Sequence, residues 1–200
     1  MSLLEAIILV VIQGLTEFLP VSSSGHLAVG EKLLDFKGPE SVALDVLVHA
    51  ATVVAILAVI LPDIIRMLRT ELRTVVMLVI ASLPAGLAGF LLEPHIEFIK
   101  ENMLVVGILF IVTASALVLA KAFSSDEKEL GRVGILDSLI IGVFQAAAIL
   151  PGISRSGFTI SSARMMGVKP RAAFNFSFML GVAAISGATL ADLKPSPSKP

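Results

Sequence analysis

Four long apolar stretches set the strongest limit on what this chain can fold into. They cover residues 42–61, 75–92, 102–120 and 172–191 and contain no internal Lys or Arg. Each comes close to or reaches the ~20 residues that a helix needs to cross a bilayer. With 56% hydrophobic and 16% charged residues, the chain is too apolar for an ordinary soluble domain. These stretches predict an all-α, polytopic membrane protein with at least four spans.

Composition excludes several other kinds of protein. The chain has no cysteine, which excludes disulfides, thiolate metal sites and cysteine nucleophiles. Its net charge of -1 gives no basic surface for nucleic acid, so we expect no nucleic-acid partner. No positive residue precedes the first apolar run, and we expect no cleaved signal peptide. We expect one membrane domain over residues 1–193, followed by a polar, Pro-rich, disordered tail over residues 194–200.

Two further apolar stretches, residues 3–29 and 135–163, are each interrupted near the middle by Pro and Gly. They align without gaps in a single register, which pairs Gln13 with Gln145, Ser22 with Ser154, Ser24 with Ser156, and Gly25 with Gly157. Chance could match a few positions in apolar sequence, but the matched residues are the unusual polar ones, which favours an internal repeat. Irregular backbone at membrane depth needs protein or water around it. Paired broken helices therefore predict that the two breaks meet in a binding site.

The distribution of Lys and Arg tests whether these two stretches cross the bilayer or turn back within it. Re-entrant hairpins place nine of these residues on one side: Arg66, Arg69, Arg73, Lys121, Lys128, Arg132, Arg164, Lys169 and Arg171. They place five on the other: Lys32, Lys37, Lys100, Lys194 and Lys199. Simple crossing gives six and eight instead, and the positive-inside rule prefers nine against five. We therefore expect an outside N-terminus and inverted-topology repeats that each start with a re-entrant hairpin, repeat 1 over about 1–123 and incomplete repeat 2 over about 133–193.

The two breaks carry distinctive motifs. The first reads QGLTEFLPVSSSGH over residues 13–26, and the second reads LPGISRSGFT over residues 150–159. In both motifs the chain resembles the undecaprenyl-pyrophosphate phosphatase family, also known as the bacitracin-resistance proteins. It is similar again in LDVLVH over residues 44–49 and in AFNFSF over residues 173–178.

The resemblance implies a multi-pass enzyme of the cell membrane whose active site faces the outside. Such an enzyme hydrolyses undecaprenyl pyrophosphate, or a related polyprenyl pyrophosphate, to the monophosphate and inorganic phosphate. It thereby recycles the lipid carrier of cell-envelope glycan synthesis. Full-length members of the family continue with two further spans. This leaves three alternatives: a natural short form, a fragment, or a homo-oligomer that borrows the missing packing from a second subunit.

Four residues are the candidate catalytic set: Ser23, His26, Arg155 and Glu17. The family motif assigns the nucleophile to Ser23, and His26 follows at i+3, on the same helical face, as a base for the serine proton. Arg155 is an ionisable residue inside an apolar segment, and its fork of donors suits two phosphate oxygens. The alternative for Arg155 is a side chain that snorkels to the membrane surface, and for His26 a structural role.

Glu17 is also the candidate metal ligand. With Gln13 at i-4 it forms a polar helical face suited to a hard cation, Mg²⁺ or Ca²⁺, that would also touch the pyrophosphate. Family members can carry a second Glu at the position of Gln13, so this chain has one negative charge fewer there. The alternative is that Glu17 is a structural hydrogen-bond partner of Arg155.

The remaining hydroxyl groups of the breaks are expected to bind substrate. They belong to Ser22, Ser24, Ser154, Ser156 and Thr159, and we expect Gln13 to join them at the substrate. The same hydroxyl groups could instead cap helices. Asp45 and His49, at i and i+4 on the first full span, are weaker candidates. We expect them to stabilise the outer end of that span rather than to bind substrate.

Two other functions compete with the phosphatase. Inverted repeats with broken helices are equally typical of a transporter or flippase, here for an anionic lipid or solute. Transport needs no nucleophile, so the set of Ser23, His26 and Arg155 favours the enzyme. A non-catalytic relative is the third hypothesis, and it is supported by Gln13 and by the absence of the two further spans.

Overall fold

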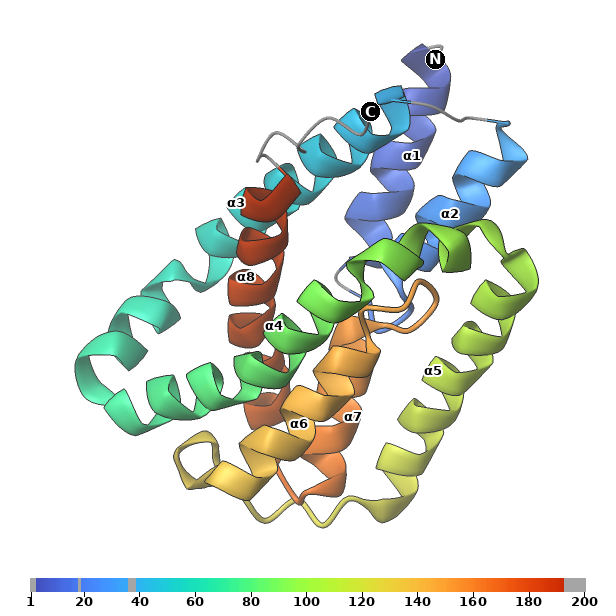
Figure 1. Cartoon of the computed structure of the whole chain (residues 1–200). Helices are drawn as coiled ribbons and strands as arrows, with labels where there is room; N and C mark the ends of the chain where they lie inside the picture. Colours follow the sequence, from blue (N-terminus) through green and yellow to red (C-terminus); the bar gives the residue numbers. More distant parts are fainter. Residues whose placement is uncertain (1–2, 18, 36–38, 193–200) are drawn as a thin grey trace.

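The computed structural model describes residues 3–17, 19–35 and 39–192, with side chains for all of these except 39–46, 63, 93–95, 97 and 185–192. The described residues form helices and no named strand, which confirms the all-α prediction (Figure 1). The predicted tail, residues 194–200, lies outside the described residues. The elements are α1 (Leu3–Thr16), α2 (Ser23–Leu33), α3 (Pro39–Thr70), α4 (Leu72–Glu101), α5 (Met103–Phe123), the 3₁₀ helix η1 (Leu130–Arg132), α6 (Ile135–Ala147), α7 (Arg155–Met165) and α8 (Pro170–Asp192).

Each of the two interrupted segments forms a pair of helices, and the helix boundaries of the two pairs align in the sequence. When Gln13 is aligned with Gln145, α2 falls residue for residue on α7, and α1 and α6 begin at equivalent positions. In the view of Figure 1 the α1–α2 pair comes from the top and the α6–α7 pair from the bottom, with their breaks near the centre. The predicted breaks are therefore confirmed. The side of the membrane that each pair faces stays a prediction.

Long apolar helices surround the two pairs. Two segments have the length and composition to cross a membrane, Leu72–Leu92 within α4 and Met103–Phe123, which is α5. A third candidate lies in α3, where Leu47–Pro62 and Ile64–Thr70 meet at 50°, next to a proline that cannot continue the helical hydrogen bonding. The fourth predicted span lies within α8, whose C-terminal part is outside the residues with described side chains. Among the described residues, two or three of the four predicted spans meet these criteria.

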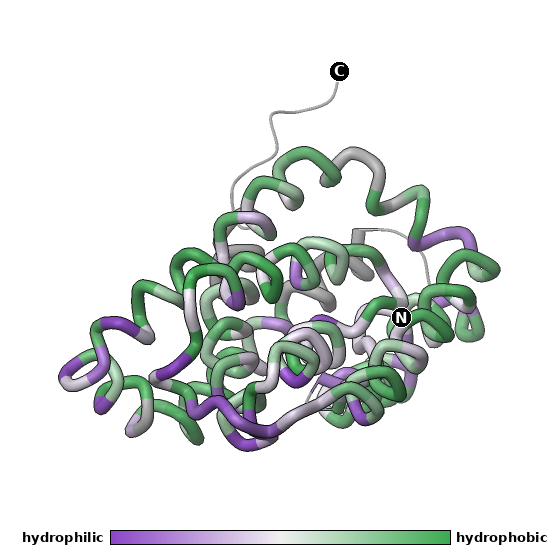
Figure 2. The backbone as a smooth tube through the Cα atoms, turned by 90° about the horizontal axis from the view of Figure 1, so that it is seen from below, coloured by the Kyte–Doolittle hydropathy of each residue, from purple (hydrophilic) through white to green (hydrophobic). Residues whose placement is uncertain are grey.

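The surface of the molecule is apolar. Large side chains such as Leu83, Phe90 and Val118 are 63%, 80% and 69% exposed. Hydrophobic residues also predominate along most of the helices in Figure 2. In water such a surface would be an extensive exposed apolar patch, which soluble monomers avoid. The bilayer is the solvent that fits it, and the chain is a membrane protein.

The second helix pair is held tightly against α4. At Gly142 in α6, an added Cβ would lie 2.5 Å from the carbonyl oxygen of Ala81 and 3.0 Å from the ring of Pro84. The two helix backbones therefore touch at this point, as small residues allow in membrane helices. Met77 and Ile141 belong to the main buried apolar cluster beside this contact.

The connections next to the second pair are joined by a backbone bridge and three ion pairs, which we call the charged clip. The backbone of Lys128 pairs with that of Val168 in a single parallel bridge. Three ion pairs add to it: Lys128 with Asp137 at 2.8 Å, Lys169 with Glu129 at 2.5 Å, and Arg164 with Asp126. Most of these groups are partly exposed, so each pair adds little stability. The clip joins the end of α5 to the start of α8, and so positions the α6–α7 pair.

Candidate active site

The two breaks meet in the centre of the molecule, as the sequence predicts. The backbone N–H of Gly152 donates to Ser22 Oγ at 3.2 Å, and Ser156 Oγ donates to the carbonyl of Leu19 at 3.3 Å. An added Cβ at Gly25 would lie 2.9 Å from the Cα of Gly152, whose φ of +104° also favours glycine. The two hydrogen bonds join segments that lie far apart in the sequence, one in each half of the repeat.

An ion pair crosses between the breaks. Arg155, the first residue of α7, donates through Nη2 to Oε1 of Glu17 at 2.9 Å. Both side chains are largely enclosed, at 21% exposed for Arg155 and 6% for Glu17. Arg155 therefore lies at the junction rather than snorkelling to a membrane surface. A buried pair of this kind needs good geometry to offset the desolvation of its two charges.

The second oxygen of Glu17 connects to the first break. Oε2 accepts a hydrogen bond from the hydroxyl of Ser23, the first residue of α2, and another from Gln13 Nε2 at 3.0 Å. The carboxylate of Glu17 thus contacts three side chains: the hydroxyl of Ser23, the guanidinium of Arg155 and the side-chain amide of Gln13. The other amide atom, Gln13 Oε1, is buried and has no hydrogen-bond partner. A buried polar atom normally has a hydrogen-bond partner, so Gln13 Oε1 is available to a ligand or water.

His26 is held differently from the arrangement that the sequence suggests. Its Nδ1 lies 2.7 Å from the carbonyl oxygen of Ser22. A carbonyl can only accept, so Nδ1 carries a proton, and in the neutral ring the lone pair is then on Nε2. The ring also packs edge-on against Phe110, with centroids 5.0 Å apart. The described hydrogen bond of Ser23 therefore goes to Glu17, not to His26.

The serines on either side of the breaks include two helix caps. Ser22 accepts from the N–H of Gly25 at 3.3 Å, and Ser154 accepts from the N–H of Gly157 at 3.1 Å. Ser24 and Ser156 lie beside these caps, with Oγ atoms 3.4 Å from Ser22 and 3.3 Å from Ser154. Two helix N-termini with their positive dipole ends therefore start at the junction, an arrangement that suits phosphate.

Two residues that the sequence analysis missed hold the second break and α7 in place. Thr113 in α5 accepts from the N–H of Ser154 at 3.0 Å and donates to the carbonyl of Gly152 at 3.1 Å. Ser177 in α8 pairs with Thr159 at 2.6 Å, and Thr159 also donates to the carbonyl of Arg155. Lone hydroxyl residues in apolar stretches are the signal that could have identified both.

Asp45 and His49, the weaker candidates, are both in α3. The side chain of Asp45 lies outside the described residues, and His49 is partly buried.

The residues at the junction fit a divalent cation only together with a substrate. No group of three or more His, Cys, Asp or Glu side chains in the described part of the chain could hold a metal. Glu17 and Gln13 are one helical turn apart, and Gln13 Oε1 has no hydrogen-bond partner, whereas both carboxylate oxygens of Glu17 accept hydrogen bonds. Mg²⁺ is commonly held by one or two carboxylates, water and substrate phosphates, so Glu17 and Gln13 would suit such an ion only where a bound diphosphate supplied further ligands.

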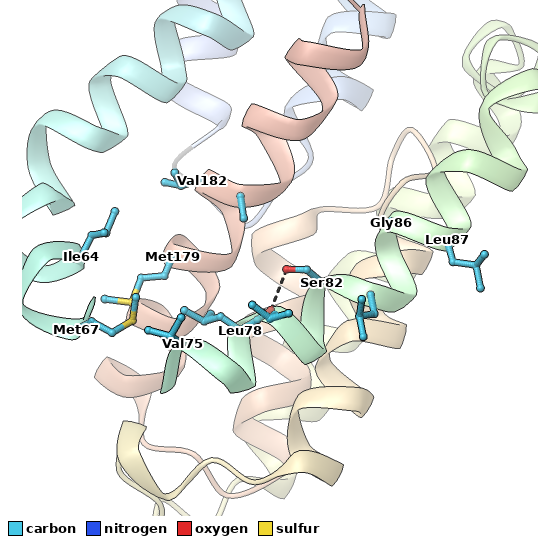
Figure 3. A pocket seen from close by; sticks show the side chains of 12 residues that line it. Ile64, Met67, Val75, Leu78, Ser82, Gly86, Leu87, Met179 and Val182 are labelled. Carbon is cyan, nitrogen blue, oxygen red and sulfur yellow. Dashed lines mark hydrogen bonds between the residues drawn. The ribbon is translucent and has the colours of Figure 1, made fainter. Parts of the chain in front are cut away.

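A separate apolar groove of about 540 Å³ lies between α3, α4 and α8 (Figure 3). Ile64, Met67, Leu78, Met179 and Val182 are among its lining residues. Ser82 points its hydroxyl at the carbonyl of Leu78, so it offers the groove little polarity. The groove contains none of the residues around Glu17, and its lining is apolar, unlike a site for a phosphate group.

Comparison with known proteins gives a consistent result. The chain matches the family model described as "Bacitracin resistance protein BacA" over residues 6–199. It is 38% identical over 195 residues to the undecaprenyl-diphosphatase of Thermosipho melanesiensis, covering 94% of this chain and 77% of that relative. It is 41% identical over 196 residues to that of Carboxydothermus hydrogenoformans, covering 97% and 74%. For the Bacteroides thetaiotaomicron enzyme the identity is 37% over 201 residues, covering 96% and 75%.

Proposed function

Because the chain belongs to the bacitracin resistance protein family, we propose that it is an integral membrane phosphatase acting on undecaprenyl diphosphate or a related polyprenyl diphosphate. The products are the polyprenyl monophosphate, which returns to use as a lipid carrier, and inorganic phosphate. The name shared by its relatives supports this substrate. The observation that carries the proposal is the carboxylate of Glu17, which contacts Arg155 and Ser23 at once.

In the first step, Ser23 Oγ attacks the terminal phosphorus of the substrate. The new Oγ–P bond forms while the bond from that phosphorus to the bridging oxygen breaks, and the polyprenyl monophosphate leaves. The serine proton passes to Glu17 Oε2, which already accepts the Ser23 hydrogen bond. Arg155 binds phosphate oxygens and stabilises the charge that spreads over them, while Glu17 fixes the orientation of its guanidinium.

In the second step, water attacks the phosphoserine. His26 Nε2 accepts a proton from this water, because Nδ1 already donates to the Ser22 carbonyl. The bond between phosphorus and Ser23 Oγ breaks, the serine oxygen recovers its proton from Glu17, inorganic phosphate leaves, and His26 releases its extra proton to water. The N-termini of α2 and α7 stabilise the anionic group in both steps.

A divalent cation, Mg²⁺ or Ca²⁺, is part of the proposal. Glu17 and Gln13 would hold it together with the substrate phosphates, where it would neutralise phosphate charge. We also propose that the chain lies in the cell membrane with the α1–α2 pair opening to the outside, in line with the Lys and Arg distribution.

The test is release of inorganic phosphate from undecaprenyl diphosphate by the purified full chain in detergent, with Mg²⁺, with Ca²⁺ and with a chelator. We expect release that needs the protein and falls when the chelator removes the cation. Release unaffected by the chelator would remove the cation from the proposal. No release, with movement of the intact lipid across liposome membranes, would favour the flippase.

A further inference from the structure

Gly181 occupies the interior of α8, where glycine is an unfavourable choice. A glycine in the middle of a helix destabilises it by roughly 0.5–1 kcal/mol relative to alanine. Gly181 is buried. Such a residue usually has a packing reason, and here the reason is the side chain that rests on it.

The guanidinium of Arg155 lies directly on this position. An added Cβ at Gly181 would be 2.8 Å from Arg155 Cζ and 3.2 Å from Nη2, and closer still to Nη1. Carbon and nitrogen atoms without a bond between them prefer about 3.5–4.0 Å, so no side chain fits beside the guanidinium as it stands. The same guanidinium is hydrogen-bonded to Glu17.

We infer that Gly181 is a positioning residue for Arg155. The absence of a side chain at Gly181 lets the guanidinium reach Glu17 and the helix N-termini at the junction. α8 supplies one surface against which the guanidinium lies, and Glu17 supplies its hydrogen-bond partner on the first break. This inference rests on the proposed function, because it assigns Gly181 to the arginine that binds the phosphates.

Other glycines of this chain provide matched comparisons. At Gly142 an added Cβ would meet the carbonyl oxygen of Ala81, which is backbone and cannot easily move. At Gly107 in α5 no atom lies within 4 Å of the added Cβ. At Gly181 the atoms that it meets form the end of a flexible side chain. Alanine at Gly181 should therefore move Arg155 rather than disturb the helix packing.

The experiment compares Gly181→Ala, Gly107→Ala and Gly142→Ala in the full chain, by phosphate release and by thermal unfolding in the same detergent. We expect Gly181→Ala to lose about 10²-fold in turnover, the order of loss that a misplacement of about 1 Å can cause. Its melting temperature should stay close to that of Gly107→Ala, which should keep full activity, while Gly142→Ala should melt at lower temperature. Full activity of Gly181→Ala, or a fall in melting temperature as large as that of Gly142→Ala, would overturn the inference.

A double-mutant cycle shows whether Gly181 acts through Arg155. In an Arg155→Lys background the guanidinium is absent, so adding Gly181→Ala should change the remaining turnover by less than about twofold. An equal loss in both backgrounds would mean that Gly181 acts on something else, and the inference would fail. Wild-type protein without phosphate release would overturn the proposed function and this inference together. Wild-type release with an unaffected Gly181→Ala would overturn the inference alone.

Discussion

The two helix pairs have the same framework but different chemistry. Ser23 and Arg155 are equivalent in the repeat, each the first residue of its helix after the break. Glu17 corresponds to Ile149, and His26 corresponds to Phe158. At these equivalent positions the carboxylate and the imidazole belong to the first pair, whereas the second pair contributes the cation. One scaffold, used twice, brings a nucleophile and a phosphate-binding group to the same junction.

The pairs also differ in how firmly they are held. Gly142 and Asp137 fix α6 against α4 and the charged clip, whereas α1 has only Leu9 and Gln13 as buried residues. The cap residues differ in backbone conformation: Ser22 has φ +66°, which is strained for a residue other than glycine, and Ser154 has φ −76°. Strained backbone gathers at functional sites. The comparison assigns the nucleophile to the first pair, and to the second pair the phosphate-binding arginine on a more firmly held support.

The largest effect should come from removing the reacting groups of the first pair. We predict that Ser23→Ala and His26→Ala each lower phosphate release by ~10²-fold or more, as for loss of a nucleophile or a general base. The double variant should be little worse than either single variant, because residues that act as a unit are not additive. Ser115→Ala, at an exposed position of α5, is the matched control and should keep full activity.

Multiplicative losses in the Ser23 and His26 double variant would show that the two residues act separately. A cation-bound water would then be the better candidate for the nucleophile. Combining Ser23→Ala with Glu17→Gln sharpens the test, because the structure pairs these two side chains directly. Activity of the Ser23→Ala variant at the wild-type level would show that Ser23 is not the nucleophile.

The role of the second pair should depend on the geometry of the Arg155 side chain and not on its charge alone. Arg155→Lys keeps the positive charge and loses the planar fork that can hold two oxygens. We predict that this variant still binds the polyprenyl diphosphate, with a dissociation constant close to that of the wild type, and loses most of its turnover. Binding and turnover can be measured separately with a radiolabelled substrate. Retention of both would show that the fork has no role.

Loss of the two caps should lower the stability of the protein by different amounts. Ser22 Oγ accepts from Gly25 within its own helix and from Gly152 across the breaks, whereas Ser154 Oγ caps Gly157. Loss of a cap costs about 1 kcal/mol, and a buried N–H left without a partner costs about 1–3 kcal/mol. We predict that Ser22→Ala is destabilised more than Ser154→Ala in chemical denaturation. Equal losses would mean that the contact between the breaks adds no stability.

The membrane topology can be tested by labelling, without an assay of activity. The chain has no native cysteine, so single cysteines can be introduced cleanly. We predict that cysteines at Arg69, Glu127 and Lys169 are labelled from one side of the membrane, and cysteines at Glu97 and at Lys37, which lies outside the described residues, from the other. Labelling of the Lys37 and Lys169 positions from the same side would remove the inverted repeat and make the hairpins ordinary spans.

Much of the framework follows from the sequence because it depends on local rules. A Pro followed by Ser and Gly in an apolar run favours a break in the helix, so the breaks and their repetition in the second half of the chain could be predicted, although α4 continues through Pro84. The alternative role of Glu17, as partner of Arg155, is the contact that the structure shows. Irregular backbone at membrane depth has few acceptable surroundings, which predicts that the breaks meet.

The finer contacts could not be predicted because they depend on the path of the chain through the breaks. The i, i+3 spacing suggests a pair of Ser23 and His26, yet Glu17 reaches Ser23 from the other side of the first break. The unusual φ of Ser22 is part of this path, and no residue type specifies it. Thr113 and Gly181 belong to helices that sequence spacing alone does not place near the junction.

The most direct test of the central claim is phosphate release by Arg155→Ala. A diphosphate brings at least two negative charges into surroundings that are mostly apolar, and an unpaired charge there costs several kcal/mol. Arg155 is the cationic side chain that the structure holds at the meeting point of the breaks, with its partner Glu17. We predict that Arg155→Ala, in purified and folded form, loses both binding of the polyprenyl diphosphate and its hydrolysis. Hydrolysis at a rate near that of the wild type would contradict the account, whatever the topology proves to be.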